Sequence, residues 1–161
     1  MITELQRPEG RRLHLWLAAL IAGCGAPAPD ELPDSPVPGF SMVQAGRDCA
    51  PWDGPAVTLT FSGQASHPDS IRPPYLHLSL WKPLSELAGR TWRWPGDEQV
   101  GGASLCVEGE DCHGATAGVV RLDRVGSDSV LTGRLRLEFG ARPEVAGSFR
   151  ATWRSRVMLC G

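Results

Sequence analysis

The chain lacks every short motif that assigns a protein to one of the common enzyme classes. It contains no GxSxG nucleophile elbow, no GxGxxG dinucleotide loop, no GxxxxGKS/T phosphate loop and no HExxH zinc-binding helix. Each of these motifs sets a nucleophile, a phosphate-binding backbone or a metal ligand at a fixed spacing. Serine hydrolases of that type, dinucleotide-dependent oxidoreductases, P-loop enzymes and zincins therefore have no support in the sequence.

Clustered positive charge and long apolar runs are also missing. The chain has 16 Lys and Arg against 18 Asp and Glu, a net charge of -2, whereas a nucleic-acid partner requires a clustered basic face. The strongly apolar run covers residues 15–22, and a helix needs roughly 20 such residues to cross a bilayer. We therefore expect neither a nucleic-acid partner nor a permanent transmembrane helix.

The N-terminal stretch has the composition of an export signal. Arginines between residues 7 and 12 precede the apolar run, and small residues come after it, which is the order found in secretory signals. The four residues that end this stretch, Ile21-Ala22-Gly23-Cys24, resemble the lipobox of bacterial lipoproteins. The alternative is a buried amphipathic helix in which the cysteine is incidental.

The lipoprotein resemblance implies a processing route and a location. In that family the chain is cut before the cysteine, whose thiol carries a diacylglyceryl group, so Cys24 is the expected lipidation site and mature N-terminus. Gly25 comes next, in place of the aspartate that retains some lipoproteins at the inner membrane. The expected location is the bacterial cell envelope, with the protein held at the outer membrane through its N-terminal lipid. Stable anchoring needs more than one acyl chain, because a single chain binds only marginally.

Prolines and acidic residues dominate the stretch after Cys24. Five prolines alternate with Asp30, Glu31 and Asp34 between residues 26 and 38, a composition that cannot build a core and favours an extended chain. The sequence therefore predicts a signal peptide over residues 1–23, a disordered Pro-rich tether over residues 24–43 and one folded domain over residues 44–161. That domain length suits a single hydrophobic core.

Four cysteines lie in the predicted domain, and an even number in an exported protein indicates two disulfides. We expect Cys106 to pair with Cys112, and Cys49 with Cys160, so that the second bond joins the start of the domain to its end. The alternative is a metal site of Cys106, Cys112 and His113. Its spacing matches neither the CxxC patterns of zinc sites nor the CxxCH of haem attachment, so no metal and no cofactor are expected.

Apolar residues recur with period two along the domain, which indicates strands with one face on a core and one face in water. The clearest runs lie around residues 57–61, 76–80, 131–139 and 149–153. The residues expected to point inward include Leu59, Phe61, Leu78, Leu80, Leu135, Leu137, Phe149 and Trp153.

Weaker strands are expected at residues 90–94, 103–108 and 117–125. A short helix is expected between Pro83 and Gly89, because proline suits a first helical turn and glycine ends a helix. Many short strands separated by turn residues predict an all-β domain, an antiparallel β-sandwich or small barrel with one short helix. The last hairpin loosely resembles those of small exported β-proteins, and this likeness implies no function.

A histidine cluster is the strongest enzymatic alternative. His67 and Asp69 lie in one predicted loop, and His77 lies in the strand after it. If the three met at one end of the sheet, they would form a two-histidine, one-carboxylate site of a kind that binds metals. Histidines in loops and on strand surfaces are more commonly solvated polar residues.

Tryptophan supplies much of the aromatic content, because the chain has six tryptophans, four phenylalanines and one tyrosine. Trp92 and Trp94 are two residues apart, so on a strand they share a face. On an outer face they would form a stacking platform for a sugar ring or an aromatic partner. On an inner face they would fill the core, which is the interpretation the composition favours.

Two functional classes remain open. The first is a non-catalytic, lipid-anchored β-domain of the cell envelope with a binding or structural role, whose partner would be an envelope protein or a glycan. The second is a small extracytoplasmic hydrolase or metal-dependent enzyme that uses His67, Asp69 and His77. The first accounts for the lipobox, the tether and the paired cysteines together, and is the function we expect.

Overall fold

The fold was analysed in a computed structural model that describes residues 31–63, 71–96, 100–109, 111–125, 130–154 and 159–160. The elements, in chain order, are β1 (Met42–Cys49), β2 (Pro55–Ser62), β3 (Tyr75–Leu80), α1 (Leu84–Leu87), β4 (Thr91–Trp94), β5 (Gly101–Cys106), β6 (His113–Gly114), β7 (Ala117–Val125), β8 (Val130–Phe139) and β9 (Arg142–Arg154). Over these ranges, no helix has the length and apolarity needed to cross a membrane.

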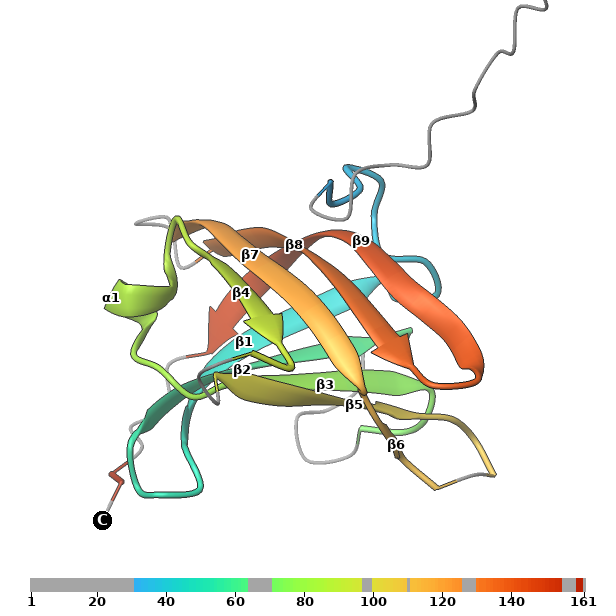
Figure 1. Cartoon of the computed structure of the whole chain (residues 1–161), viewed down its shortest axis with the longest axis horizontal. Coiled ribbons are helices and arrows are strands. Elements are labelled where there is room, and N and C mark those ends of the chain that lie inside the picture. The colour runs from blue at the N-terminus through green and yellow to red at the C-terminus, as the bar shows by residue number, and fades with distance from the viewer. Residues whose placement is uncertain are drawn as a thin grey trace, which may run out of the picture.

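All the strands belong to one sheet in the order β4-β7-β8-β9-β1-β2-β3-β5-β6. The sheet folds over, so that the layer of β4, β7 and β8 lies across the core from the layer of β2, β3 and β5 (Figure 1). This confirms the predicted all-β class with one short helix. Two features differ from the prediction: the sheet is not closed into a barrel, and it is mixed, because β1 pairs with β9 in parallel.

The core lies between the two layers and consists of the inward residues of the alternating runs. Seven of the residues predicted to point inward are buried: Leu59, Phe61, Leu78, Leu80, Leu135, Leu137 and Phe149. Trp153 is partly buried and packs against them. The rings of Phe61 and Phe149 meet edge to face, with centroids 5.3 Å apart, and so connect β2 with β9.

The predicted short helix is present as α1. Pro83 precedes it, and Gly89 lies just after it with φ +74°, a left-handed conformation that glycine adopts without a steric penalty. Leu87 is fully buried, and the Gly89 N–H donates to the Leu122 carbonyl at 2.8 Å. The helix therefore closes the core beside β7.

Residues 31–41, which composition places in the tether, lie against the sheet. Leu32 and Val37 are buried, the Val37 N–H donates to the Ser148 carbonyl at 3.1 Å, and the Ser148 N–H donates to the Ser35 carbonyl at 2.7 Å. Proline favours an extended backbone, and here that backbone pairs with β9 just before β1 does. The folded part therefore begins before residue 44. The predicted signal peptide, Cys24 and the first part of the tether lie outside the described residues.

Both predicted disulfides are confirmed. Cys49 is bonded to Cys160, with Cα atoms 5.5 Å apart, and joins the end of β1 to the C-terminal residues. Cys106 is bonded to Cys112 and closes the loop between β5 and β6. Cys106 and Cys112 are bonded to each other, so neither supplies a free thiol to the alternative metal site.

Candidate functional site: an exposed tryptophan hairpin and its cleft

The predicted histidine cluster is only partly within the described residues. His67 and Asp69 lie outside them. His77 is half-buried on the outer face of β3, where its Nδ1 lies 3.5 Å from Thr60 Oγ1. Burial lowers the pKa of His77, and attraction by Asp48 raises it in part. Within the described ranges, no three His, Cys, Asp or Glu side chains are grouped so that they could hold a metal ion.

Trp92 and Trp94 share one face of β4, as predicted, and that face points to the core. Both are partly buried and pack against the core cluster, and neither indole N–H has a hydrogen-bond partner among the described residues. The ring of Trp94 lies directly over Gly118 of β7, where a Cβ would overlap it. This placement corresponds to the core interpretation of the pair, because neither residue presents an outward stacking platform.

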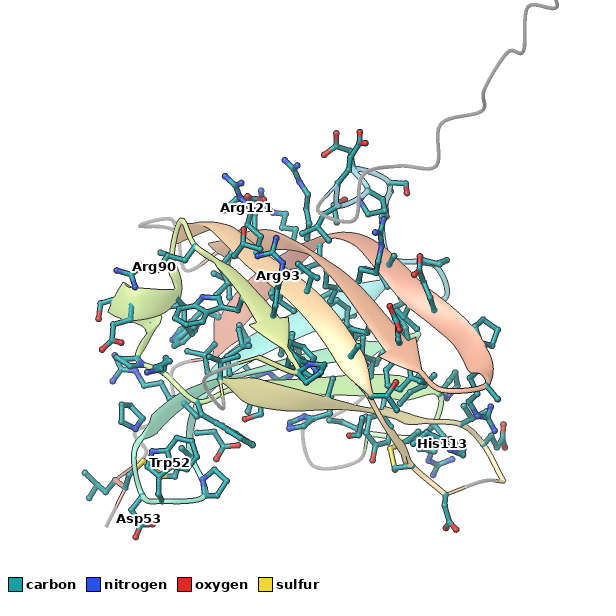
Figure 2. The ribbon with its side chains drawn as sticks, in the orientation of Figure 1. Trp52, Asp53, Arg90, Arg93, His113 and Arg121 are labelled. Atoms are coloured by element: carbon teal, nitrogen blue, oxygen red, sulfur yellow. A yellow bond between two sulfur atoms is a disulfide. The ribbon has the colours of Figure 1, made fainter. Side chains whose placement is uncertain are left out.

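The tryptophan that reaches solvent is Trp52. It lies in the turn between β1 and β2, next to Asp53, and Figure 2 shows both residues at this end of the molecule. The Trp52 side chain is 53% exposed, which is a large fraction for a large apolar residue. An exposed tryptophan of this kind presents an apolar surface with a polar N–H at one edge.

Backbone hydrogen bonds hold the hairpin tip in shape. The Ala50 N–H donates to the Gly54 carbonyl at 2.7 Å, and the Asp53 N–H donates to the Ala50 carbonyl at 3.0 Å. Asp53 has φ 61°, a left-handed conformation that aspartate tolerates better than most residues. The sequence PWDG therefore forms a tight turn in which Trp52 and Asp53 have fixed positions.

Two neighbours hold the Trp52 ring itself. The Trp81 ring meets it edge to face, with centroids 5.3 Å apart and an interplanar angle of 80°. On another side, a Cβ added at Gly54 would lie 2.9 Å from Trp52 Nε1, so the indole occupies space that only glycine leaves open. The Cys49–Cys160 disulfide ties the β1 side of the hairpin to the C-terminal residues. The ring is therefore exposed but held in place.

A cleft of about 400 Å³ opens beside the hairpin. Its apolar walls include Val57, Leu84 and Trp153, and Arg47 and Asp48 also line it. The Asp48 carboxylate accepts a hydrogen bond from the Cys49 N–H at 2.8 Å. We call Trp52, Asp53, Trp81 and this cleft the hairpin end of the molecule.

Comparison of the chain with protein-family profiles, curated proteins and solved structures finds no match. The hairpin end therefore has to be interpreted from its own chemistry. It combines a rigid exposed ring, a carboxylate and a cleft with apolar and charged walls, which suits binding. Sequence reasoning missed Trp52 because it looked for tryptophans paired along a strand. The available signal was the turn sequence PWDG, which begins two residues after the disulfide cysteine Cys49.

Proposed function

We propose that this chain is a lipid-anchored domain of the bacterial cell envelope that binds a partner, without catalysis, through its hairpin end. The observation that carries this proposal is the exposed but immobilised Trp52. Large exposed apolar side chains that are held rigid have a low entropic cost of binding. Such a group is favourable in a binding surface and has no evident use in a structural spacer.

The position of the hairpin end supports a binding role for an anchored protein. The segment of residues 31–41 lies at one end of the molecule, and the β1–β2 hairpin lies at the opposite end (Figure 1). If Cys24 carries the lipid, only residues 25–30 separate the anchor from the folded part. The hairpin end then faces away from the anchoring leaflet, towards envelope proteins or glycans. Gly25 after the cysteine favours the outer membrane as the site of anchoring.

The anchor is tested by Cys24→Ser. The variant should leave the membrane fraction or accumulate as the uncut precursor, because the thiol that receives the lipid is gone. Fractionation of cells followed by mass spectrometry of the N-terminal peptide measures both outcomes. A Cys24→Ser protein that is processed and sediments with membranes as the parent does would show that the anchor assignment is wrong.

The binding surface is tested by site-specific crosslinking in cells. A photo-crosslinking residue introduced at Pro51, which is exposed beside Trp52, should give a discrete adduct, whereas the same residue at Glu138, exposed on β8, should not. Trp52→Ala, combined with the crosslinker at Pro51, should abolish the adduct at unchanged protein level. Equal labelling from both positions would mean that the hairpin end is not a specific binding surface.

The enzymatic alternative rests on His77. Its lowered pKa favours a neutral imidazole, the form that accepts a proton or binds a metal. Under the proposed function, His67→Ala and His77→Ala each leave the envelope phenotype of the parent intact. If either variant lost the phenotype while the fold and protein level were preserved, the enzyme or metal-site alternative would replace the binding proposal.

A further inference from the structure

We infer that the hairpin end recognises a saccharide, with a pyranose ring stacked on Trp52 and its hydroxyls donating hydrogen bonds to the Asp53 carboxylate. The inference rests on the proposed function, in which the hairpin end is the binding surface, and names the class of ligand. Trp52 and Asp53 are consecutive residues of the turn, at the same end of the molecule (Figure 2), and both are exposed.

The size of the apolar surface argues against a protein as the main partner. Among the described residues, the exposed large hydrophobic side chains are Trp52, Ile71 and Leu159. A stable protein interface buries roughly 800 Å² on each partner, whereas half of one tryptophan offers on the order of 100 Å². That area is comparable to one face of a single sugar ring, and a saccharide needs no larger apolar patch.

The chemistry around the ring also suits a saccharide. A pyranose with equatorial hydroxyls has a face of C–H groups, which packs on an indole, and a rim of hydroxyl donors. The Asp53 carboxylate accepts such hydrogen bonds, which are stronger than those between neutral groups. Asp48 and Arg47 line the adjoining cleft and provide further polar partners for a neighbouring sugar unit. β-1,4-linked oligomers are suitable probes, because their equatorial linkages keep successive rings flat.

The restrained position of Trp52 explains how a single aromatic ring is enough to bind a sugar. Trp81 and the close approach of Gly54 restrict the Trp52 indole. A weak ligand gains most from a site that loses little side-chain freedom on binding. Gly54→Ala therefore tests the position of the indole separately from its presence. The variant keeps Trp52 in the chain but forces its ring to move.

The test uses residues 25–161, which contain every strand and both disulfides. Tetrasaccharides of β-1,4-linked N-acetylglucosamine and of β-1,4-linked glucose are titrated while tryptophan fluorescence and NMR spectra are recorded. We expect saturable binding of at least one of them, with a dissociation constant on the order of 1 mM or below. Trp52→Ala should weaken binding by at least about tenfold.

Matched variants assign the roles of the neighbouring residues. Leu159→Ala removes another exposed apolar side chain from the same end, 90% exposed in the parent, and should leave binding within about twofold. Asp53→Asn keeps the turn, because asparagine tolerates a left-handed backbone, and should weaken binding severalfold by removing the charge. Gly54→Ala should weaken binding without loss of the folded NMR spectrum.

The result that overturns the inference is the absence of saturable binding of either tetrasaccharide to the parent, or binding by Trp52→Ala that equals the parent's. If the tetrasaccharides fail while the Pro51 crosslinker captures one protein in a Trp52-dependent manner, the ligand class is wrong and the binding function stands. If both experiments fail, the proposed function fails with the inference.

Discussion

In the sequence, His77 is a candidate catalytic or metal-binding residue. In the fold, it lies in a row of uncharged side chains on the sheet. The register aligns it with Thr60 on β2 and Ser104 on β5. Gln44 continues the row on β1, opposite Thr60. The row contains no charged side chain at these four positions, and desolvation of the imidazole outweighs the attraction of Asp48. Its lowered pKa results from that desolvation.

This environment predicts a pH dependence of stability. The His77 pKa is lowered from its ordinary value of 6.5, so at a pH between the folded and unfolded values the unfolded chain binds more protons. Stability should therefore fall as the pH drops through about 6.5 and below, and be fully present above it. Urea unfolding between pH 5 and pH 8 measures this, and His77→Gln should flatten the slope. An unchanged slope in the variant would assign the dependence to other groups.

Neighbouring residues on β8 should differ sharply in their contribution to stability. Leu137 is fully buried, so Leu137→Ala should lower the free energy of unfolding by about 2 to 5 kcal/mol. Glu138 is exposed, and Glu138→Ala should change it by no more than about 0.5 kcal/mol. Denaturant unfolding of the pair gives both values. The reverse ranking would mean that the faces of β8 are exchanged.

Arg136 departs from the simple inside–outside pattern. Alternation places it on the outer face of β8, yet its side chain is only 17% exposed. Its guanidinium donates to the Glu31 carbonyl at 2.9 Å and lies 3.6 Å from the Glu144 carboxylate. The N-terminal segment therefore covers part of this outer face, which alternation within β8 alone cannot show.

At the scale of elements, local sequence patterns predicted which residues form strands, but not which strands pair with one another. β2, β3, β8 and β9 were predictable because a slip of one residue would expose a whole apolar row. For β4, composition favoured an inward face for the tryptophans of TWRW, although the alternation alone left an outward stacking platform as the alternative. Leu32 and Val37 were missed because prolines and acids surround them, and their burial depends on β9, more than 100 residues away in the chain.

The arrangement of the hairpin end could not be predicted from the sequence for a similar reason. Trp52 lies in a turn, and turn composition does not say whether a side chain is covered by other elements. Its ring position depends on Trp81, which comes directly after β3. The cleft depends on α1 and Cys160 as well as on β1 and β2. The parallel pairing of β1 with β9 is also non-local, and the predicted Cys49–Cys160 bond was its one sequence signal.

The two disulfides should contribute unequally to stability. Cys49 and Cys160 are 111 residues apart and Cys106 and Cys112 are 6 apart. On the chain-entropy model, loops of these sizes correspond to about 4.7 and about 2 kcal/mol. Cys49→Ser/Cys160→Ser should therefore lower the urea midpoint more than Cys106→Ser/Cys112→Ser does. Equal midpoints for the two double variants would contradict this ranking.

The docking of the N-terminal segment depends on Gly147. Its φ is +155°, and a Cβ there would lie 2.6 Å from the Val37 backbone nitrogen and 2.7 Å from the Ser35 carbonyl oxygen. Gly147→Ala should displace residues 35–37 and lower the free energy of unfolding by roughly 1 to 3 kcal/mol. Hydrogen exchange should show lost protection at the Val37 amide. Ala146→Gly, at the neighbouring position, is the control, and retained Val37 protection in Gly147→Ala would contradict the close approach.

For the whole molecule, one continuous sheet supplies both layers and one core. β1 connects the layers, because it pairs with β2 on one side and β9 on the other. The sheet ends at β4 and β6, which have four and two residues. Short edge strands of this kind offer little template for pairing with another chain.

This architecture predicts a single cooperative unfolding transition. Neither layer can bury its inner face alone, since the core cluster draws residues from both, and Phe61 and Phe149 contact each other between β2 and β9. Far-UV circular dichroism reports on the sheet, whereas near-UV circular dichroism reports on the packing of the tryptophans against the core. The two curves should coincide in urea, as expected of a small two-state domain. A Val37→Asp variant should shift both curves together to lower urea, because it places a charge in the shared core. Separation of the two curves in either protein would show that the layers unfold independently and that β1 does not couple them.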